Sequence, residues 1–409
     1  MHPRQAAAVA GGLRAALPAS RGRVARAWAR LRADEGFRLA VTVAVLMRVV
    51  LGIAALIVRA IQGPATGPLE NHPEAATATT SPFWPLVGPF ERWDGLWYLH
   101  IAGTGYPAHG PEAAFSPLFP LLVRVVSLPL GGRIGLAAFA VDTVAAVLAL
   151  WAVWHAVDDA LGSAVATRTV LLLSVFPGAF FLLAPYPEGL VLALAAGALL
   201  LARRRAWLAA GGLAALAALC RPQGAVLAPA LLVEAVAAAG WRPLRIGWRP
   251  LAAVALPAAA LGAWFVYCMA ALGLRLGPLT ALTNWGHRTV WPWQVLADSG
   301  QAVVEWRHSE ELGNLCVALG LLLLLPLIAR RLPPGWTAYT AVAIAFSLAN
   351  EPMWTPLMSL MRYAVTLFPA FALVATWRLP RWAWVATGIV AAGAELYLLQ
   401  SFVHRLFVA

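Results

Sequence analysis

The feature that most constrains this sequence is a series of long apolar runs that recurs along almost its whole length. Such runs cover residues 39–61, 136–153, 190–202, 251–272, 315–328 and 382–399. A helix of about 20 residues crosses the ~30 Å hydrocarbon core of a bilayer. Hydrophobic residues make up 61% of the chain and charged residues only 12%, whereas soluble domains average about 25% charged. The sequence therefore predicts an all-α, polytopic membrane protein.

We expect about 11 or 12 membrane helices, some of them short or tilted. Besides the run at 39–61, the expected spans are 115–130, 134–157, 165–184, 189–202, 206–219, 225–239, 251–272, 312–328, 336–348, 358–376 and 382–402. The chain shows no repeated halves of the kind that mark inverted-repeat transporters.

The basic residues of the chain, all of them arginine, are gathered in short clusters between the apolar runs. The net charge is +12, and the clusters lie at residues 14–38, 203–205, 242–249, 330–331 and 378–381. This distribution is typical of cytoplasmic loops and disfavours a nucleic-acid partner. Exclusive use of arginine is typical of a GC-rich bacterial genome. We expect a multi-pass protein among the lipids of a bacterial plasma membrane, with a basic cytoplasmic tail at 1–36 and a membrane domain at 37–409.

The longest polar segment, residues 62–115, follows the first helix and is rich in Pro, Gly, Thr and Trp. If the N-terminus is cytoplasmic, this first loop is extracytoplasmic. Strict alternation of the later spans would place the basic cluster at 203–205 outside, so one segment must not cross. Segment 115–130 carries three prolines and is best explained as a re-entrant or broken helix packed against protein. The polar segments 185–189, 221–224, 273–311 and 350–356 then share the face of the first loop.

The sharpest local feature is the block at residues 91–102, which contains Trp93-Asp94-Gly95 and His100. It predicts a short helix at the membrane face with Asp94 near its start, where free N–H groups and the helix dipole favour an ionised carboxylate. Asp94 is therefore a candidate catalytic residue, although an aspartate there is also a common N-cap. His100 fits either the same site or helix packing.

Metal-ligand patterns are missing from the sequence. No Asp-x-Asp pair includes Asp94, and the three cysteines, Cys220, Cys268 and Cys316, form no Cys-x-x-Cys or Cys/His pattern. We therefore predict no metal site and no cofactor.

Further motifs stand at the outer ends of the expected spans. They are Phe-Ser-Pro-Leu-Phe-Pro from Phe115, Tyr-Pro-Glu at 186–188, Arg-Pro-Gln-Gly at 221–224, Arg-Tyr at 362–363 and Phe-Pro at 368–369. Together with the Trp-Asp-Gly block they resemble the glycosylphosphatidylinositol mannosyltransferase II (PIG-V-like) family, which belongs to the GT-C superfamily of membrane glycosyltransferases. The resemblance extends over residues 41–371.

This resemblance implies a GT-C-type membrane domain and transfer of a sugar, usually mannose, from a polyprenyl-phosphate-linked donor. The acceptor is expected to be a lipid or glycan on the extracytoplasmic face, and the acid of the first loop, Asp94, is expected to be the general base. The acceptor named for the family is not carried over, because bacteria have no glycosylphosphatidylinositol pathway.

Transfer from a phosphate-linked sugar also needs cationic groups for the departing phosphate. Arg221 and Arg362 stand at the outer ends of expected spans. A guanidinium offers paired N–H donors to phosphate, although arginines at helix ends also commonly extend to the membrane interface. Glu188, Tyr186, His100 and Trp93 complete the candidate substrate-binding set.

The residues alone leave open the role of two charges within the apolar runs and two other functions for the whole protein. Arg48 and Asp142 lie within apolar runs, where charged groups are functional candidates by default, but they are expected to pair with each other.

A secondary transporter or lipid flippase would also have many helices and a few buried charges. A glycopolymer ligase or polymerase of another membrane fold would also use a lipid-phosphate donor.

Overall fold

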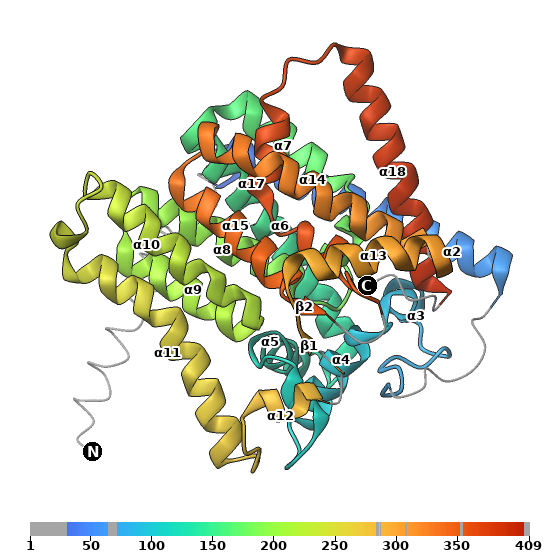
Figure 1. Cartoon of the computed structure of the whole chain (residues 1–409). Coiled ribbons are helices and arrows are strands. Elements are labelled where there is room, and N and C mark those ends of the chain that lie inside the picture. Colours follow the sequence, from blue (N-terminus) through green and yellow to red (C-terminus); the bar gives the residue numbers. More distant parts are fainter. Residues whose placement is uncertain are drawn as a thin grey trace, which may run out of the picture.

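The structure is a computed structural model that describes residues 31–63, 72–283, 286, 288–306, 309–351 and 355–404. It is a bundle of helices (Figure 1). The β-structure among these residues is one antiparallel ladder, in which β1 (Arg288–Thr289) pairs with β2 (Asn350–Glu351). The predicted all-α class is confirmed.

Five described helices are long and apolar enough to cross a membrane. They are α2 (Glu35–Gln62), α6 (Ile134–Leu161), α11 (Trp248–Ala270), α14 (Ser309–Arg331) and α18 (Arg381–Val403). Large apolar side chains project from them to the outside, as with Leu46, Leu323 and Ile389, which are 56%, 76% and 68% exposed. Such surfaces are stable against lipid rather than water, so the predicted polytopic membrane architecture is confirmed.

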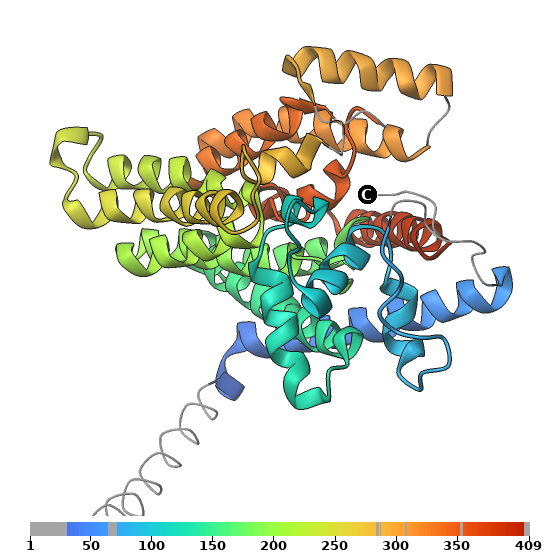
Figure 2. The same cartoon turned by 90° about the horizontal axis from the view of Figure 1, so that it is seen from below.

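Six shorter apolar helices fill the bundle between the long ones. They are α7 (Ser163–Ser174), α8 (Glu188–Arg203), α9 (Trp207–Cys220), α10 (Leu227–Ala238), α15 (Pro334–Leu348) and α17 (Phe368–Ala375). In both views α9, α10 and α11 form one side of the bundle, and α18 and the C-terminal end of α2 lie on the opposite side (Figures 1 and 2). The remaining short elements are α3 (Trp84–Val87), η1 (Gly88–Phe90), η2 (Pro111–Ala114), η5 (Pro222–Val226), η6 (Pro243–Arg245), α12 (Pro278–Leu282) and α13 (Pro292–Trp306).

Two expected spans are broken near the end of the bundle that carries the first loop. The span expected at 165–184 ends as a helix at Ser174 and continues through Pro177 into the short η4 (Ala179–Leu182). The span expected at 358–376 is divided into α16 (Leu360–Ala364) and α17, which begins with Phe368 and Pro369. Proline lacks the N–H that continues a helix and restricts the residue before it. Both breaks bring polar groups to the same region.

α5 (Leu118–Ser127) does not carry the chain across the bundle, because its 10 residues span only about 15 Å and both ends lie beside the first loop. Near its start, Phe119 packs edge-on against Tyr98, with ring centroids 5.4 Å apart. After η3 (Leu128–Leu130), α6 begins, and Gly135 in its first turn lies against Thr77 and Glu91. This geometry supports the non-crossing segment that the arginine distribution requires.

The opposite end of the bundle carries the basic clusters. Asp34 caps α2 by accepting a 2.7 Å hydrogen bond from the Phe37 N–H, and its carboxylate lies 3.0 Å from His155 near the end of α6. At the end of α8, Arg203 and Arg204 form ion pairs with Asp159 of α6 at 3.3 and 3.1 Å. The start of α2 and the ends of α6 and α8 therefore lie at the same end of the bundle, away from the first loop.

Candidate functional site

Five of the predicted site residues meet where four helix ends come together. Asp94 begins α4 (Asp94–Thr104), Glu188 begins α8, Arg221 follows α9, and Arg362 lies in the short α16. Tyr186 stands in the loop just before α8. These positions come from distant parts of the chain, so only the packing of the bundle makes them neighbours.

Asp94 is held by Arg362 and is the most accessible charge of the group. The Arg362 Nη1 donates a 2.8 Å hydrogen bond to Asp94 Oδ2. The Asp94 side chain is 31% exposed, whereas that of Arg362 is 3% exposed. The N-cap alternative is not what the structure has, since Trp93 occupies the cap position of α4 and no side chain caps it. The carboxylate is thus fixed on one side and open on the other.

Glu188 is fully buried and is shared by two arginines. Arg221 donates a hydrogen bond to Glu188 Oε1, and the Arg362 Nε lies 3.2 Å from the same oxygen. A buried carboxylate requires this kind of pairing, because an unpaired charge in a low-dielectric interior is costly. Its place in the first turn of α8 adds the favourable field of the helix N-terminus. Glu188 therefore fixes the two guanidinium groups relative to each other.

Aromatic side chains complete the walls of the cluster. The Arg221 guanidinium lies 4.0 Å from the ring centroid of Tyr363, and that of Arg362 lies 5.1 Å from Tyr186. Arg362 also donates to the Tyr363 hydroxyl at 3.2 Å, and the Tyr186 hydroxyl donates to the carbonyl of Arg92 at 3.0 Å. Rings stacked on guanidinium groups hold them in place.

Two tyrosines of the cluster were not among the predicted site residues. Tyr363 directly follows Arg362, so the Arg-Tyr motif contained the signal. Tyr98 is buried one helical turn after Asp94, and its ring centroid is 6.5 Å from that of Tyr186. Burial raises the pKa of Tyr98 well above its ordinary value, so it is a neutral phenol beside the charges. The i, i+4 spacing from Asp94 was the available clue.

Trp93 and His100 have different places. Trp93 precedes Asp94 with a positive φ of 50°, and His72 lies edge-on to it at 5.6 Å. His100 turns about 240° around α4 from Asp94 and lies 3.6 Å from Glu112. Trp93 therefore borders the cluster, whereas His100 is not brought to it.

An apolar pocket of about 580 Å³ adjoins the cluster on the side of Arg221 and Tyr363. Its walls come from α8, η5, α10, α15 and the α16–α17 segment. Most of the lining is apolar, as with Val191, Leu227 and Ile344. Arg221 and Tyr363 therefore form a shared wall, with the Asp94–Arg362 pair on one side and an apolar space on the other.

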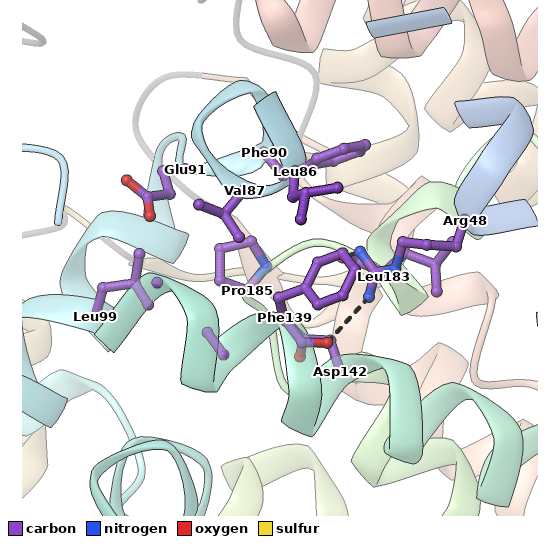
Figure 3. Close-up of a pocket in the computed structure, with 12 residues that line it drawn as sticks. Arg48, Leu86, Val87, Phe90, Glu91, Leu99, Phe139, Asp142, Leu183 and Pro185 are labelled. Atoms are coloured by element: carbon purple, nitrogen blue, oxygen red, sulfur yellow. Dashed lines mark hydrogen bonds between the residues drawn. The ribbon is translucent and has the colours of Figure 1, made fainter. Parts of the chain in front are cut away.

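Arg48 and Asp142 line a separate pocket of about 230 Å³ and approach each other from α2 and α6 (Figure 3). Their opposite charges attract each other. Arg48 also donates to the Leu183 carbonyl at 2.5 Å and to the Thr143 hydroxyl at 2.9 Å. Arg48 is thus bound by neutral oxygens, and its pairing with Asp142 stays a prediction.

Glu91 also lines this second pocket but is bound to the first loop. Its carboxylate accepts hydrogen bonds from the N–H and the hydroxyl of Thr77 at 3.0 and 2.7 Å. Burial raises the pKa of Glu91 even though these hydrogen bonds oppose the shift. Within the described ranges, no three His, Cys, Asp or Glu side chains lie close enough together to hold a metal ion.

The cluster combines an accessible carboxylate with a buried arginine that faces an apolar space. The carboxylate can accept a proton from a hydroxyl group, and the arginine can bind an anion. An apolar wall beside the arginine suits an anion that carries a hydrocarbon chain.

Comparison with known proteins gives one family match. The family model described as mannosyltransferase (PIG-V) matches residues 40–234. This segment contains Asp94, Tyr186, Glu188 and Arg221. A comparison with curated proteins gives no significant match.

Among solved structures, the chain is similar to ArnT from Cupriavidus metallidurans bound to undecaprenyl phosphate, with 17% identity, a TM-score of 0.48, and coverage of 83% of this chain and 62% of that one. It is also similar to the oligosaccharyltransferase of Archaeoglobus fulgidus, with 13% identity, a TM-score of 0.43, and coverage of 88% and 53%. The chain thus spans between half and two thirds of the length of these proteins.

The family match supports a glycosyltransferase. The resemblance to the PIG-V family predicted from the motifs is confirmed over residues 40–234.

Proposed function

We propose that this protein transfers a sugar, most simply mannose, from a polyprenyl-phosphate donor to a lipid or glycan acceptor. The observation that carries the proposal is that one cluster contains both an accessible carboxylate and a buried arginine beside an apolar pocket. The carboxylate is Asp94, which is held by Arg362, and the buried arginine is Arg221. The matched PIG-V family supports mannose as the sugar.

Asp94 acts as the general base. It accepts the proton of the acceptor hydroxyl while the hydroxyl oxygen forms a bond to the anomeric carbon of the donor sugar. The bond from that carbon to the phosphate oxygen breaks, and the electron pair leaves with the lipid phosphate. A positioned base typically contributes about 10²–10⁴-fold to the rate. Arg362 keeps the carboxylate in place through its 2.8 Å hydrogen bond.

Arg221 is assigned to the phosphate. Arg362 already has polar contacts with Asp94, Glu188 and Tyr363. Arg221 shares Glu188 but also lines the apolar pocket. A guanidinium there meets a phosphate with paired donors, and the apolar lining receives the first part of the hydrocarbon chain. Arg362 adds positive charge nearby, because it contacts the same Glu188 oxygen as Arg221.

The active site is proposed to face the extracytoplasmic side of a bacterial plasma membrane. The arginine clusters at 203–205, 242–249, 330–331 and 378–381 favour a cytoplasmic position for the opposite end of the bundle. A lipid-linked donor reaches a site at the extracytoplasmic surface of the plasma membrane, where nucleotide sugars are absent.

The test is to supply membranes containing the protein with radiolabelled polyprenyl-phosphate mannose and to identify the labelled product. We expect label in a lipid or glycan fraction only when the protein is present. Purified protein given GDP-mannose alone, without polyprenyl phosphate or another transferase, is expected to form no product. Robust transfer from GDP-mannose would contradict the donor assignment.

A further inference from the structure

The short helix α16, which carries Arg362, is held from outside by two buried side chains of α14. Glu311 Oε1 accepts a hydrogen bond from the Leu357 N–H at 3.1 Å, and Asn314 Oδ1 accepts one from the Met361 N–H at 2.9 Å. Glu311 is 1% exposed and Asn314 is 6% exposed. The 3-residue spacing places both on one face of α14.

A close backbone approach from another segment also fixes α16. A Cβ atom added at Gly178 would lie 2.6 Å from the carbonyl oxygen of Met361. The loop between α7 and η4 therefore packs directly against the backbone of α16, and no side chain fits between them.

This segment needs such support, because its own helix is short. α16 has five residues, and Ser359 before it has a left-handed backbone with a φ of 68°. The first N–H groups of a helix have no partners within it. Side-chain oxygens of α14 accept hydrogen bonds from the N–H of Leu357, just before α16, and from the N–H of Met361, in its first turn. These bonds fix the backbone conformation of the segment.

We propose that Glu311 and Asn314 are positioning residues that set the location of Arg362 and, through it, the orientation of Asp94. This inference rests on the proposed function only for its rate measurement. Met361 directly precedes Arg362, so the hydrogen bond to Asn314 fixes the backbone from which the guanidinium extends. The 2.8 Å contact between Arg362 and Asp94 then transmits the position of α16 to the first turn of α4.

The kinetic test compares Glu311→Leu and Asn314→Leu with Glu311→Gln. The leucine variants remove the acceptor oxygen, and we expect kcat to fall about 10- to 100-fold, since small displacements of a catalytic group cost up to about 10²-fold. The donor KM should change less than kcat, because Arg221 and most of the pocket lining lie outside α16, which contributes only Leu360 and Tyr363 to it. Glu311→Gln keeps an acceptor oxygen for the Leu357 N–H and is expected to restore most of the rate.

Coupling to Arg362 is measured by repeating each substitution in an Arg362→Lys background. If the α14 residues act through Arg362, their effect on kcat becomes clearly smaller there, because lysine cannot make the same contacts. Equal fold losses in both backgrounds, with transfer intact in the unmodified protein, would overturn the positioning role and leave the proposed function standing.

Amide hydrogen exchange tests the same inference without an assay of sugar transfer. Glu311→Leu should raise amide exchange in residues 355–364 and also at the start of α4. The matched control is Glu234→Leu, which removes another buried carboxylate that accepts from a backbone N–H, that of Gly335, at 3.1 Å. We expect the control to lower the unfolding temperature without raising exchange at α4. Exchange at α4 that stays unchanged in Glu311→Leu would overturn the inference even if the donor assignment failed.

Discussion

Arg362 and Asp94 are separated by 268 positions in the chain, yet their side chains are joined by a 2.8 Å hydrogen bond. The arginine is almost completely buried and the carboxylate is 31% exposed. A buried cation thus holds an accessible anion at the junction of α4 and α16. The bond links the most specific motif of the first loop to the last polar motif of the chain.

We expect Asp94→Asn to lower transfer about 10²–10⁴-fold, because an amide cannot accept the proton of the acceptor hydroxyl. The amide oxygen can still accept from Arg362, so the protein should fold and insert normally. The measurement is the initial rate of transfer from radiolabelled polyprenyl-phosphate mannose, with the amount of protein in the membrane as control. A rate near that of the unmodified protein would remove Asp94 from the mechanism.

Arg221→Ala should weaken use of the donor by about 10- to 100-fold, in line with the loss of a charge-assisted hydrogen bond. Glu188 keeps Arg362 as a partner, so its charge does not become unpaired. Arg221→Lys is expected to restore the function only in part, because lysine keeps the charge but lacks the paired donors. The comparison is made on kcat/KM for the lipid donor.

If Arg362 rather than Arg221 holds the phosphate, the pattern reverses. Arg362→Lys would then raise the donor KM, and Arg221→Lys would leave it nearly unchanged. The assignment made here predicts that Arg362→Lys acts mainly on kcat, because its principal contact is with Asp94.

The apolar pocket predicts an effect of donor chain length. Ala343 lines the pocket from α15, and Ala343→Phe should fill part of it. We expect the KM for a long-chain polyprenyl donor to rise several-fold, with a smaller effect for a short-chain analogue. The matched control is Ala345→Phe on the exposed face of the same helix. Equal KM values for Ala343→Phe and Ala345→Phe would show that the chain binds elsewhere.

The orientation of the bundle can be tested with single cysteines in a Cys316→Ser background, since Cys316 is the exposed native cysteine among the described residues. Cysteines at Thr79 and Ala108, both exposed in the first loop, should react with an impermeant reagent in intact cells. Cysteines at Ala206 and Leu244, at the other end, should react only after lysis. The reverse pattern would contradict an extracytoplasmic active site. Gly189 is unsuitable because it is buried.

Features that depend on local composition could be predicted from the sequence. Ten of the twelve expected spans each correspond to one described helix, because apolar length determines where a helix can lie in lipid. The exceptions, 165–184 and 358–376, contain breaks near proline whose depth the hydropathy pattern does not reveal. The non-crossing segment at α5 was predicted only because the arginine clusters constrain the count of crossings.

The site was predictable as a set of residue types but not as an arrangement. Asp94, Glu188, Arg221 and Arg362 stood out because charges at the ends of apolar runs are uncommon. Their partners did not, since nothing in the spacing says that Glu188 joins two arginines or that His100 pairs with Glu112. Glu311 and Asn314 escaped notice because the start of an apolar helix commonly carries polar residues.

The sequence by itself therefore determined that this chain is a polytopic helical membrane protein with charged motifs at one face, because burial in lipid is decided by each segment's own hydropathy. Only the tertiary structure decided which charges meet, because ion pairs between residues as distant as Asp94 and Arg362 depend on how the helices pack. It also decided that Arg362 faces a carboxylate while Arg221 faces an apolar pocket. The two arginines have the same side chain, and their proposed roles differ only because the packing of the helices gives them different neighbours.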